Sequence, residues 1–500
     1  MKCIQQVLVI VVALFVTGGD FSQSAEPIDV GSDKQLILDG LFLAESRGVS
    51  LKIHPPRKTG DATLRREHEW ESASLNWFNV VQDRGRIDRR AKYRMWYEAY
   101  DVDGWPTAND TSFCYAESRD GIRWTKPVLQ MFSYKGSDRN NILFRQIGSK
   151  ASGNRSRVHG TGVFIDTHAP PKARYKAVGQ GLFVRPGQRP HRIAGMYSAD
   201  GLKWTRLSKP IIDVFADSQY SGFWDASRER YVVFGRVGGR GRSIGRSESV
   251  DFFHLDPLKL VSQTSDSDPP NSDLYNSPAI KYAHAPNVYL MFPSLYQHGP
   301  DTLDIRLAVS RDGIRWSRPD RMTAFIALGK GKVFDSGSLY MGQGMIRVED
   351  ELWLYYSGSP LRHQGAELKN LTKPENARVY SRVVARLDRF VAATAGPDGG
   401  SFTSPPLRFT GNKLNLNVRV HSGGHLRIGL LDADGHPVPK FSVSECVPIT
   451  GDSLRKSVEW KGEGDLGSLA TKPIRLRIKM SDARLFGFQF TSGTSQGKTR

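Results

Sequence analysis

Apolar and polar positions alternate along most of the chain in short segments that end in turns. The segment 113–121 (FCYAESRDG) reads as a strand that runs into an Asp-Gly turn, and 193–201 and 305–313 repeat it. In each copy a Trp follows the Gly after two further residues. Asp bonds its own backbone in such turns and Gly supplies a positive φ. We therefore predict that each Trp packs back across the gap between neighbouring sheets.

The turns belong to a longer repeat. A strand rich in aromatic and β-branched residues precedes each turn strand, at 92–100, 173–181 and 288–296. Two further copies have lost the Asp-Gly turn but keep the order of inner, middle and outer strand. The five inner segments lie at 66–85, 158–170, 217–230, 275–287 and 335–351. Internal repetition of this kind predicts an all-β protein built around a five-bladed β-propeller.

The two ends of the chain differ from the repeats. Residues 1–25 combine a positive start, a short apolar run and small residues near the end, which is typical of a cleaved signal peptide. We therefore expect a secreted or periplasmic protein, with an uncleaved anchor as the alternative. The strand-like pair at 35–46 and 49–56 is expected to complete the last blade of the ring.

Beyond the repeats the composition changes. We predict a propeller over 29–395, a Gly, Ser and Pro linker over 396–406, and a jelly-roll-like β-sandwich over 407–492. The last segment has alternating strands and Gly turns but none of the Trp-containing turns. Its role is either to stabilise the ring or to bind carbohydrate.

The motifs HEWES, YRMWYEAY, GFWD and RLDRF, together with the three turns, give the chain a family resemblance. It resembles the five-bladed propeller glycosidases, a superfamily with invertases, levansucrases, arabinanases and mannoside phosphorylases, and especially secreted bacterial proteins of the invertase type. The resemblance implies a glycosidase whose catalytic acids come from different blades near the central channel. The chain contains no Arg-Asp-Pro motif, which invertase-like members have in a later blade.

The formal net charge is +19, and the basic residues are scattered along the whole sequence. This distribution favours an acidic or sulfated polysaccharide as partner, or a general role of the charge in solubility; no nucleic-acid motif accompanies it. We expect a monomer with no membrane contact once the signal peptide is removed. No zinc spacing or EF-hand loop occurs, so we expect no metal and no cofactor.

Carboxylates mark the expected site. Long loops fall on the face where the inner strands begin, and a substrate is expected there. Glycoside hydrolysis needs two carboxyl groups, about 5 to 5.5 Å apart for retention and about 6.5 to 9.5 Å apart for inversion. Glu71 and Asp217, in different blades, are the candidate pair, and Glu98 and Asp101 are a candidate acid or its helper. Each of these residues has a purely structural alternative, such as an ion pair with Arg.

Sugar-binding residues are expected beside these acids. The candidates are His159, Asn276, Trp77, Trp105 and Phe223, because aromatic rings stack on sugars and polar groups bond hydroxyls. The predicted function is a glycoside hydrolase acting on a poly- or oligosaccharide. Three alternatives stay open: a glycan-binding propeller without catalysis, a sialidase-like hydrolase, and a protein-interaction platform. The sialidase turn motif is one residue longer than the turn found here.

Overall fold

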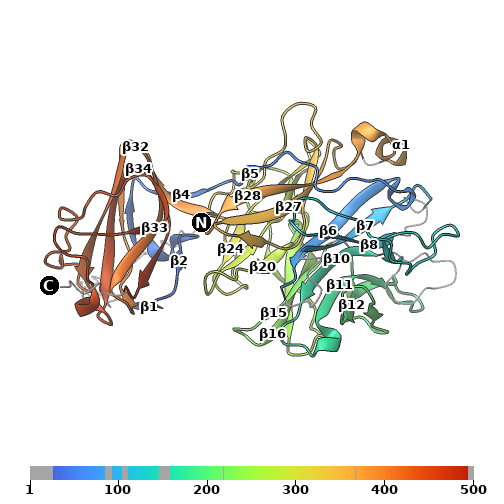
Figure 1. Ribbon diagram of the computed structural model, residues 1–500, viewed down its shortest axis with the longest axis horizontal. Coiled ribbons are helices and arrows are strands. Elements are labelled where there is room, and N and C mark those ends of the chain that lie inside the picture. Colours follow the sequence, from blue (N-terminus) through green and yellow to red (C-terminus); the bar gives the residue numbers. More distant parts are fainter. Residues whose placement is uncertain are drawn as a thin grey trace, which may run out of the picture.

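The computed structural model describes residues 26–84, 93–103, 111–145, 158–217, 219–365 and 367–493. The predicted signal peptide and Trp105 lie outside these ranges. Figure 1 shows a ring of sheets joined to a second module that carries the C-terminal strands. Within the described residues the regular structure is β apart from the short helix α1 (Leu368–Leu371) and single 3-10 turns, which confirms the all-β prediction. No helix in these residues has the length and apolarity to cross a membrane.

The first three repeats form separate antiparallel sheets in the ring. Repeat one consists of β6 (Ser74–Gln82), β7 (Tyr93–Tyr100), β8 (Ser112–Ser118) and β9 (Ile142–Phe144). Repeat two consists of β10 (His159–Ile165), β11 (Tyr175–Leu182), β12 (His191–Ser198), β13 (Thr205–Arg206) and β14 (Ile212–Phe215). Repeat three consists of β15 (Ser221–Asp225), β16 (Arg230–Gly239), β17 (Gly241–Ser249) and β18 (Lys259–Ser262). Every position of β7 is buried, because sheets stack on both of its faces.

Repeats four and five share hydrogen bonds. Repeat four consists of β19 (Ser272–Leu274), β20 (Ala279–Lys281), β21 (Tyr289–Met291), β22 (Ser294–Gln297), β23 (Thr302–Ile305) and β24 (Ala308–Ser310). Pro293 has no N–H group to donate, and it divides the ladder into two short parts. Repeat five consists of β25 (Ser338–Met341), β26 (Ile346–Val348), β27 (Glu351–Ser359), β28 (Val379–Arg386) and β5 (Arg57–Lys58).

The number of blades differs from the prediction. β23 pairs with β25 through Leu303 and Ser338, which joins β19, β22 and β23 of repeat four to repeat five in one eight-stranded sheet. The other strands of repeat four, β20, β21 and β24, form a separate three-stranded sheet. The ring has four blades, and not the five predicted, although all five strand repeats are present.

The Asp-Gly turns have the geometry that the sequence predicts. In the first copy Asp120 Oδ1 accepts hydrogen bonds of 2.8 Å from the backbone N–H groups of Ile122 and Arg123. Gly121 has a φ of 75°, and the indole of Trp124 donates to its carbonyl oxygen. Trp124 also meets Tyr355 of repeat five edge to face, so the Trp does cover the gap between sheets. The other two copies repeat these contacts.

The C-terminal module is one ten-stranded sheet around an apolar core. Its later strands are β29 (Val391–Ala395), β30 (Gly400–Thr403), β31 (Leu407–Phe409), β32 (Lys413–Asp432), β33 (Asp452–Ser457) and β34 (Ile474–Thr491). Its early strands are β1 (Ile28–Gly31), β2 (Gln35–Leu36), β3 (Glu45–Arg47) and β4 (Ser50–Ile53). A jelly-roll arrangement of this sheet stays a prediction.

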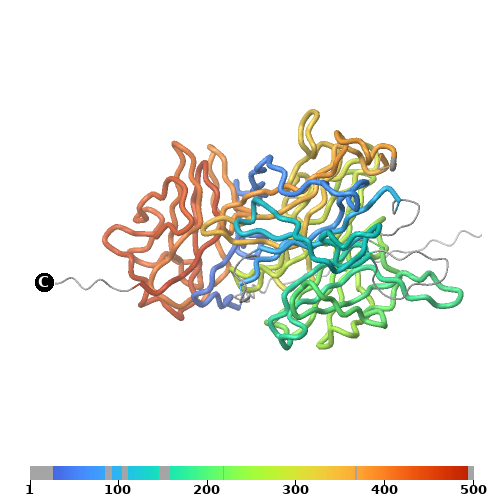
Figure 2. The backbone as a smooth tube through the Cα atoms, turned by 45° about the vertical axis from the view of Figure 1, so that its right-hand side comes forward, coloured from blue at the N-terminus to red at the C-terminus, as the bar shows by residue number. Residues whose placement is uncertain are grey.

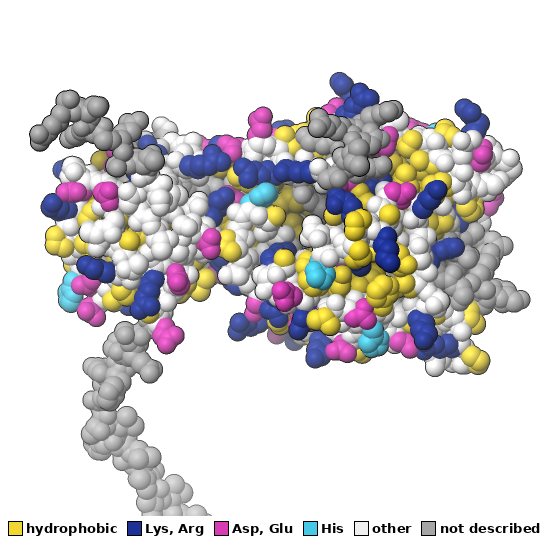
Figure 3. Space-filling model, turned by 60° about the horizontal axis from the view of Figure 1, so that its bottom comes forward, with side chains coloured by type: hydrophobic (Ala, Val, Ile, Leu, Met, Phe, Trp, Pro, Cys, Tyr) yellow, Lys and Arg dark blue, Asp and Glu magenta, His cyan; other side chains and the backbone are white. Residues whose placement is uncertain are grey.

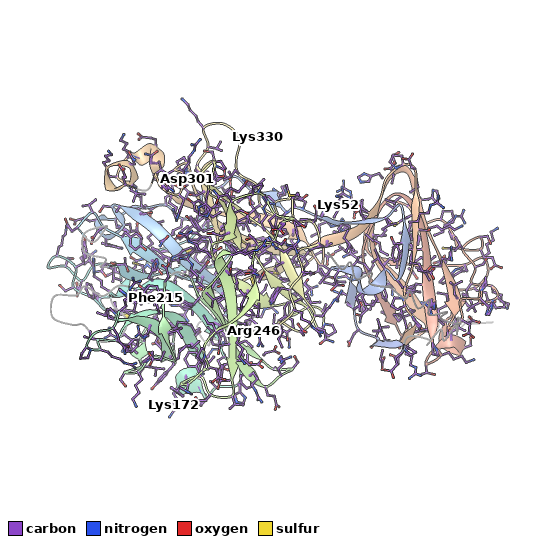
Figure 4. The ribbon with its side chains drawn as sticks, turned by 180° about the vertical axis from the view of Figure 1, so that it is seen from behind. Lys52, Lys172, Phe215, Arg246, Asp301 and Lys330 are labelled. Atoms are coloured by element: carbon purple, nitrogen blue, oxygen red, sulfur yellow. The ribbon has the colours of Figure 1, made fainter. Side chains whose placement is uncertain are left out.

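The strand pairing of the C-terminal module corrects two expectations. β2, β3 and β4 pair with the C-terminal strands, and only the short β5 joins the last ring sheet. The physical reason is that Val30, Ile37 and Phe42 are buried in the C-terminal core. The segment predicted as a linker contributes β30 to the same sheet. Figure 2 shows the blue early trace against the orange-red strands, and Figure 4 places Lys52 of β4 between the two modules.

The surface agrees with the scattered charge of the sequence. On the face shown in Figure 3, Lys and Arg side chains are spread over the molecule and are interspersed with Asp and Glu. The overall positive charge therefore does not single out one region of this face, and a binding site has to be sought in the cavities.

Candidate functional site

A pocket of about 350 Å³ opens at the face of the ring where the inner strands begin. All five repeats contribute to it, because propeller blades bring the starts of their inner strands to the same axis. Its lining includes Trp77, His159, Asp217, Tyr275 and Tyr340, one from each repeat in turn. The segment after β27 and the helix α1 border the pocket, and α1 lies on the side of the ring away from the C-terminal sheet (Figure 1).

Aromatic rings form one wall of this axial pocket. The ring centroids of Trp77 and Tyr340 lie 5.1 Å apart, edge to face, and Tyr275 stacks against Trp77 at 6.5 Å. Trp77 is 4% exposed, and its indole N–H has no hydrogen-bond partner among the described residues. Sugar rings present C–H faces that pack on aromatic surfaces, so this wall suits a saccharide.

Asp217 is the carboxylate on the pocket wall. It precedes β15, and its side chain is 43% exposed. It forms an ion pair with Arg236, whose guanidinium carbon lies 4.6 Å from the centroid of the Tyr275 ring. The backbone N–H of Asp217 donates a 2.8 Å hydrogen bond to the hydroxyl of Tyr220, which fixes the turn. Asp217 is the only Asp or Glu that lines the pocket within the described part of the chain.

Glu98 lies behind the pocket, next to two residues that line it. Its Oε2 is 3.4 Å from Nδ1 of His159 and 3.5 Å from the hydroxyl of Tyr100, and its Oε1 accepts a 3.2 Å hydrogen bond from the backbone N–H of Thr161. The side chain of Glu98 is only 1% exposed. Glu98 therefore acts on the pocket through His159, whose ring it orients.

Arg side chains and a neutral imidazole lie against the aromatic rings Tyr275 and Tyr340 on the aromatic wall of the pocket. Arg378 and His363 line the pocket, and Arg242 lies 5.0 Å from the centroid of the Tyr275 ring. Burial, together with the positive charges of Arg242, Arg378 and Arg236, lowers the pKa of His363 to about 4 against the opposing effect of Asp301. His363 is therefore uncharged near neutral pH.

Asp301 holds the loop that covers this wall. Its Oδ2 accepts a 2.9 Å hydrogen bond from the backbone N–H of Gln364, and its Oδ1 accepts a 2.8 Å hydrogen bond from the hydroxyl of Tyr296. Figure 4 places Asp301 at the upper edge of the ring, near α1. The long loop after β27, which the sequence indicates for this face, is thereby fixed over the pocket.

Two of the candidate acids lie elsewhere. Glu71 is fully buried at the end of a 3-10 turn (Glu69–Glu71), where it accepts 2.7 Å hydrogen bonds from Tyr97 and from the backbone N–H of Glu67. Lys126 completes its shell at 2.8 Å. Asp101 is 3% exposed and accepts hydrogen bonds from Tyr134 and Arg145. Neither lines the axial pocket, so the structure gives both carboxylates a role in packing.

The other candidates are also divided. His159 and Trp77 line the pocket. Asn276 is buried beside it and bonds Gln219 and the backbone N–H of Ser294, next to the break at Pro293. Phe223 lines a different cavity of about 1290 Å³, where the inner strands end near the C-terminal module. Trp105 is outside the described residues.

The sequence analysis missed Tyr275, Tyr340, His363 and Arg378. Tyr275 is the neighbour of Asn276, and side chains of consecutive extended residues point in opposite directions, so an error of one position in the register exchanges them. Tyr340 lies within β25, and its position in an inner strand was the available signal. Nothing local marks His363 or Arg378.

No protein-family model matches the chain, and no curated protein matches it. Several solved structures are similar to it. A glycosyl hydrolase from Bacteroides ovatus shares 14% identity over 72% of this chain and 98% of its own, with a TM-score of 0.47.

A second structure is described as belonging to the GH130 family of mannoside phosphorylases, which contains glycoside hydrolases that target β-1,2 mannosidic linkages in Candida mannan. It shares 14% identity over 72% of this chain and 99% of its own, with a TM-score of 0.47. An N-acetylgalactosamine deacetylase from F. plautii shares 15% identity over 69% of this chain and 95% of its own, with a TM-score of 0.43. At these TM-scores the likeness carries no inference about activity, which has to come from the pocket.

Proposed function

We propose that the protein is a glycoside hydrolase-like enzyme that acts on a poly- or oligosaccharide in the axial pocket. The observation that carries this proposal is the convergence of Trp77, Tyr275, Tyr340 and the carboxylate of Asp217 in one cavity, each from a different repeat. Aromatic faces hold the sugar rings, and a carboxylate beside them supplies the base or nucleophile that glycosidic cleavage requires.

The roles follow from the contacts. Asp217 is the base or nucleophile. His159 gives its proton to the glycosidic oxygen as the bond between that oxygen and the anomeric carbon breaks. Water then supplies a hydroxyl to the anomeric carbon and a proton that restores His159. Glu98 is a positioning residue, since it reaches the pocket through Nδ1 of His159. We also propose that residues 1–25 direct the protein out of the cytoplasm. The protein would meet such a polymer outside the cytoplasm.

The test is hydrolysis of a panel of neutral, uronic and sulfated glycans by the purified protein. Asp217→Asn is expected to lower kcat by orders of magnitude while the fold survives, because its side chain is 43% exposed. Asp213→Asn is the matched control: it also pairs with Arg, through Arg185 and Arg192, but does not line the pocket. Equal activity of the two variants would show that Asp217 takes no part in catalysis.

A second candidate is a glycan-binding propeller without catalysis. The observation in its favour is that Asp217 alone among the described acidic residues lines the pocket, whereas two-carboxylate chemistry asks for a pair. Binding of a glycan without any turnover, in wild type as in Asp217→Asn, would establish this candidate in place of the enzyme.

A further inference from the structure

Arg378 lines the pocket without a carboxylate partner among the described residues. One of its terminal nitrogens donates a 3.2 Å hydrogen bond to Oδ1 of Asn76, and its guanidinium carbon lies 4.8 Å from the centroid of the Tyr340 ring. Its Nε is buried without a hydrogen-bond partner, and no carboxylate in the described residues lies within ion-pair distance of Arg378. A partly buried cation without an anionic partner is costly unless a ligand provides one.

The Arg side chains in and beside the pocket carry more positive charge than the neighbouring carboxylates neutralise. Asp217 offsets Arg236, and Asp273 offsets Arg242 at 3.0 Å. Arg362, which is exposed on the rim, adds a second positive charge for which the described residues offer no carboxylate. The two ion pairs thus leave Arg378 and Arg362 as a net positive charge on one wall.

The groups around these charges suit an oxyanion. A guanidinium presents a planar fork of N–H donors that matches a carboxylate or a sulfate. His363, uncharged near neutral pH, sits on the same wall with its Nδ1 3.1 Å from the hydroxyl of Tyr340. The imidazole thus adds hydrogen-bonding capacity without further charge.

We propose that Arg378, supported by Arg362 on the rim, forms a subsite that recognises a sulfate or carboxylate group carried by the glycan. This inference rests on the proposed function and narrows its substrate class to anionic saccharides. A free inorganic anion would offer the same chemistry, and the experiment separates the two sources.

The experiment measures binding by titration calorimetry at one fixed ionic strength, with two matched pairs of ligands. The first pair is an oligogalacturonide and its methyl ester, and the second is a sulfated galactan oligosaccharide and its desulfated form. Sodium sulfate and sodium phosphate are titrated alone. The variants are Arg378→Gln and Arg362→Gln. Arg315→Gln is the control, because Arg315 is 91% exposed on a turn outside the pocket.

Wild type and Arg315→Gln are expected to bind the charged member of at least one pair about tenfold to a hundredfold more tightly than its neutral counterpart. Arg378→Gln is expected to abolish that preference while the affinity for the neutral member stays within about threefold. Thermal unfolding checks that Arg378→Gln folds. If Arg378→Gln does not fold, Arg362→Gln still tests the subsite, because it alters an exposed position and should lose part of the preference for the charged ligand.

Three outcomes would overturn the inference. Equal binding of the charged and neutral members of each pair by the wild type would rule out the subsite. The proposed function would still stand if a neutral glycan were cleaved. Binding of inorganic sulfate or phosphate alone, lost in Arg378→Gln, would assign the cluster to a free anion. If no ligand of any kind bound, the proposed function would fail together with the subsite.

Discussion

The hydroxyl of Tyr231, in repeat three, donates a 2.8 Å hydrogen bond to the buried Oδ2 of Asp166, at the end of the inner strand of repeat two. The same contact joins other neighbouring repeats, from Tyr175 to Asp83 and from Tyr289 to Asp225. Each carboxylate thus fastens one blade to the next. Polar contacts as well as apolar side chains between the sheets therefore hold neighbouring blades together around the axial pocket.

Tyr231→Phe is expected to destabilise the protein by about 2 kcal/mol, because it removes one hydrogen bond to a buried charge. Lys176 still pairs with Asp166, so the fold should survive. Thermal unfolding measures the effect. Tyr197→Phe is the control, since the hydroxyl of Tyr197 has no hydrogen bond within the described chain. Equal melting temperatures of the two variants would contradict the tie between blades.

The two glycines Gly201 and Gly313 should respond differently to Ala. Both have positive φ angles, 73° and 72°, so both variants carry a backbone cost of roughly 1–2 kcal/mol. A Cβ at Gly201 would lie 2.7 Å from buried atoms of Arg94 and Trp96, whereas one at Gly313 would lie 3.2 Å from Tyr289. We expect Gly201→Ala to lower the melting temperature clearly more than Gly313→Ala. The opposite order would show that packing behind the turn does not matter.

The stabilising contribution of Asp312 to its turn should be lost in acid. Burial alone would raise the pKa of Asp312, but hydrogen bonds from the backbone N–H groups of Arg315 and Ile314 outweigh it and lower the pKa to about 2. The folded value lies below the unfolded one, so the contribution to stability is present above about pH 4 and is lost as the pH falls towards 2. The difference in melting temperature between wild type and Asp312→Ala should therefore shrink from pH 5 to pH 2. A constant difference would contradict the shift.

The sequence predicts the turns well because their contacts are local. Ser118, Asp120, Gly121 and Trp124 contact one another within seven residues, so their spacing alone specifies the motif. The alternation of apolar and polar positions also predicts β4 as a strand, but it does not predict which strand pairs with β4. In the structure β4 pairs with β29, which lies more than 300 residues away in the chain. Strand pairing at this distance depends on which apolar faces the whole fold buries.

The sequence does not predict which acidic side chains line the pocket, because the residue type does not reveal where a side chain points. Glu71 and Asp217 both stand at the start of an inner segment, yet one is buried in a 3-10 turn and the other lines the pocket. The difference lies in partners that are remote in sequence: Lys126 draws Glu71 into the ring, while Arg236 holds Asp217 at the pocket wall. Sequence spacing contains neither relationship.

Glu71→Gln separates the structural role of this residue from a catalytic one. The substitution leaves Lys126, which is 4% exposed, with the exposed Glu67 at 3.1 Å as its one carboxylate partner in the described part of the chain. Breaking a buried ion pair costs about 3 kcal/mol or more, so the melting temperature should fall clearly. The kcat of the folded fraction should stay within about twofold of wild type, because Glu71 does not line the pocket. Glu69→Gln is the control: it removes the neighbouring carboxylate of the same turn, which is exposed and pairs with Lys135 at 2.6 Å. A loss of kcat by orders of magnitude in Glu71→Gln, with an unchanged melting temperature, would return Glu71 to the chemistry and contradict the site described above.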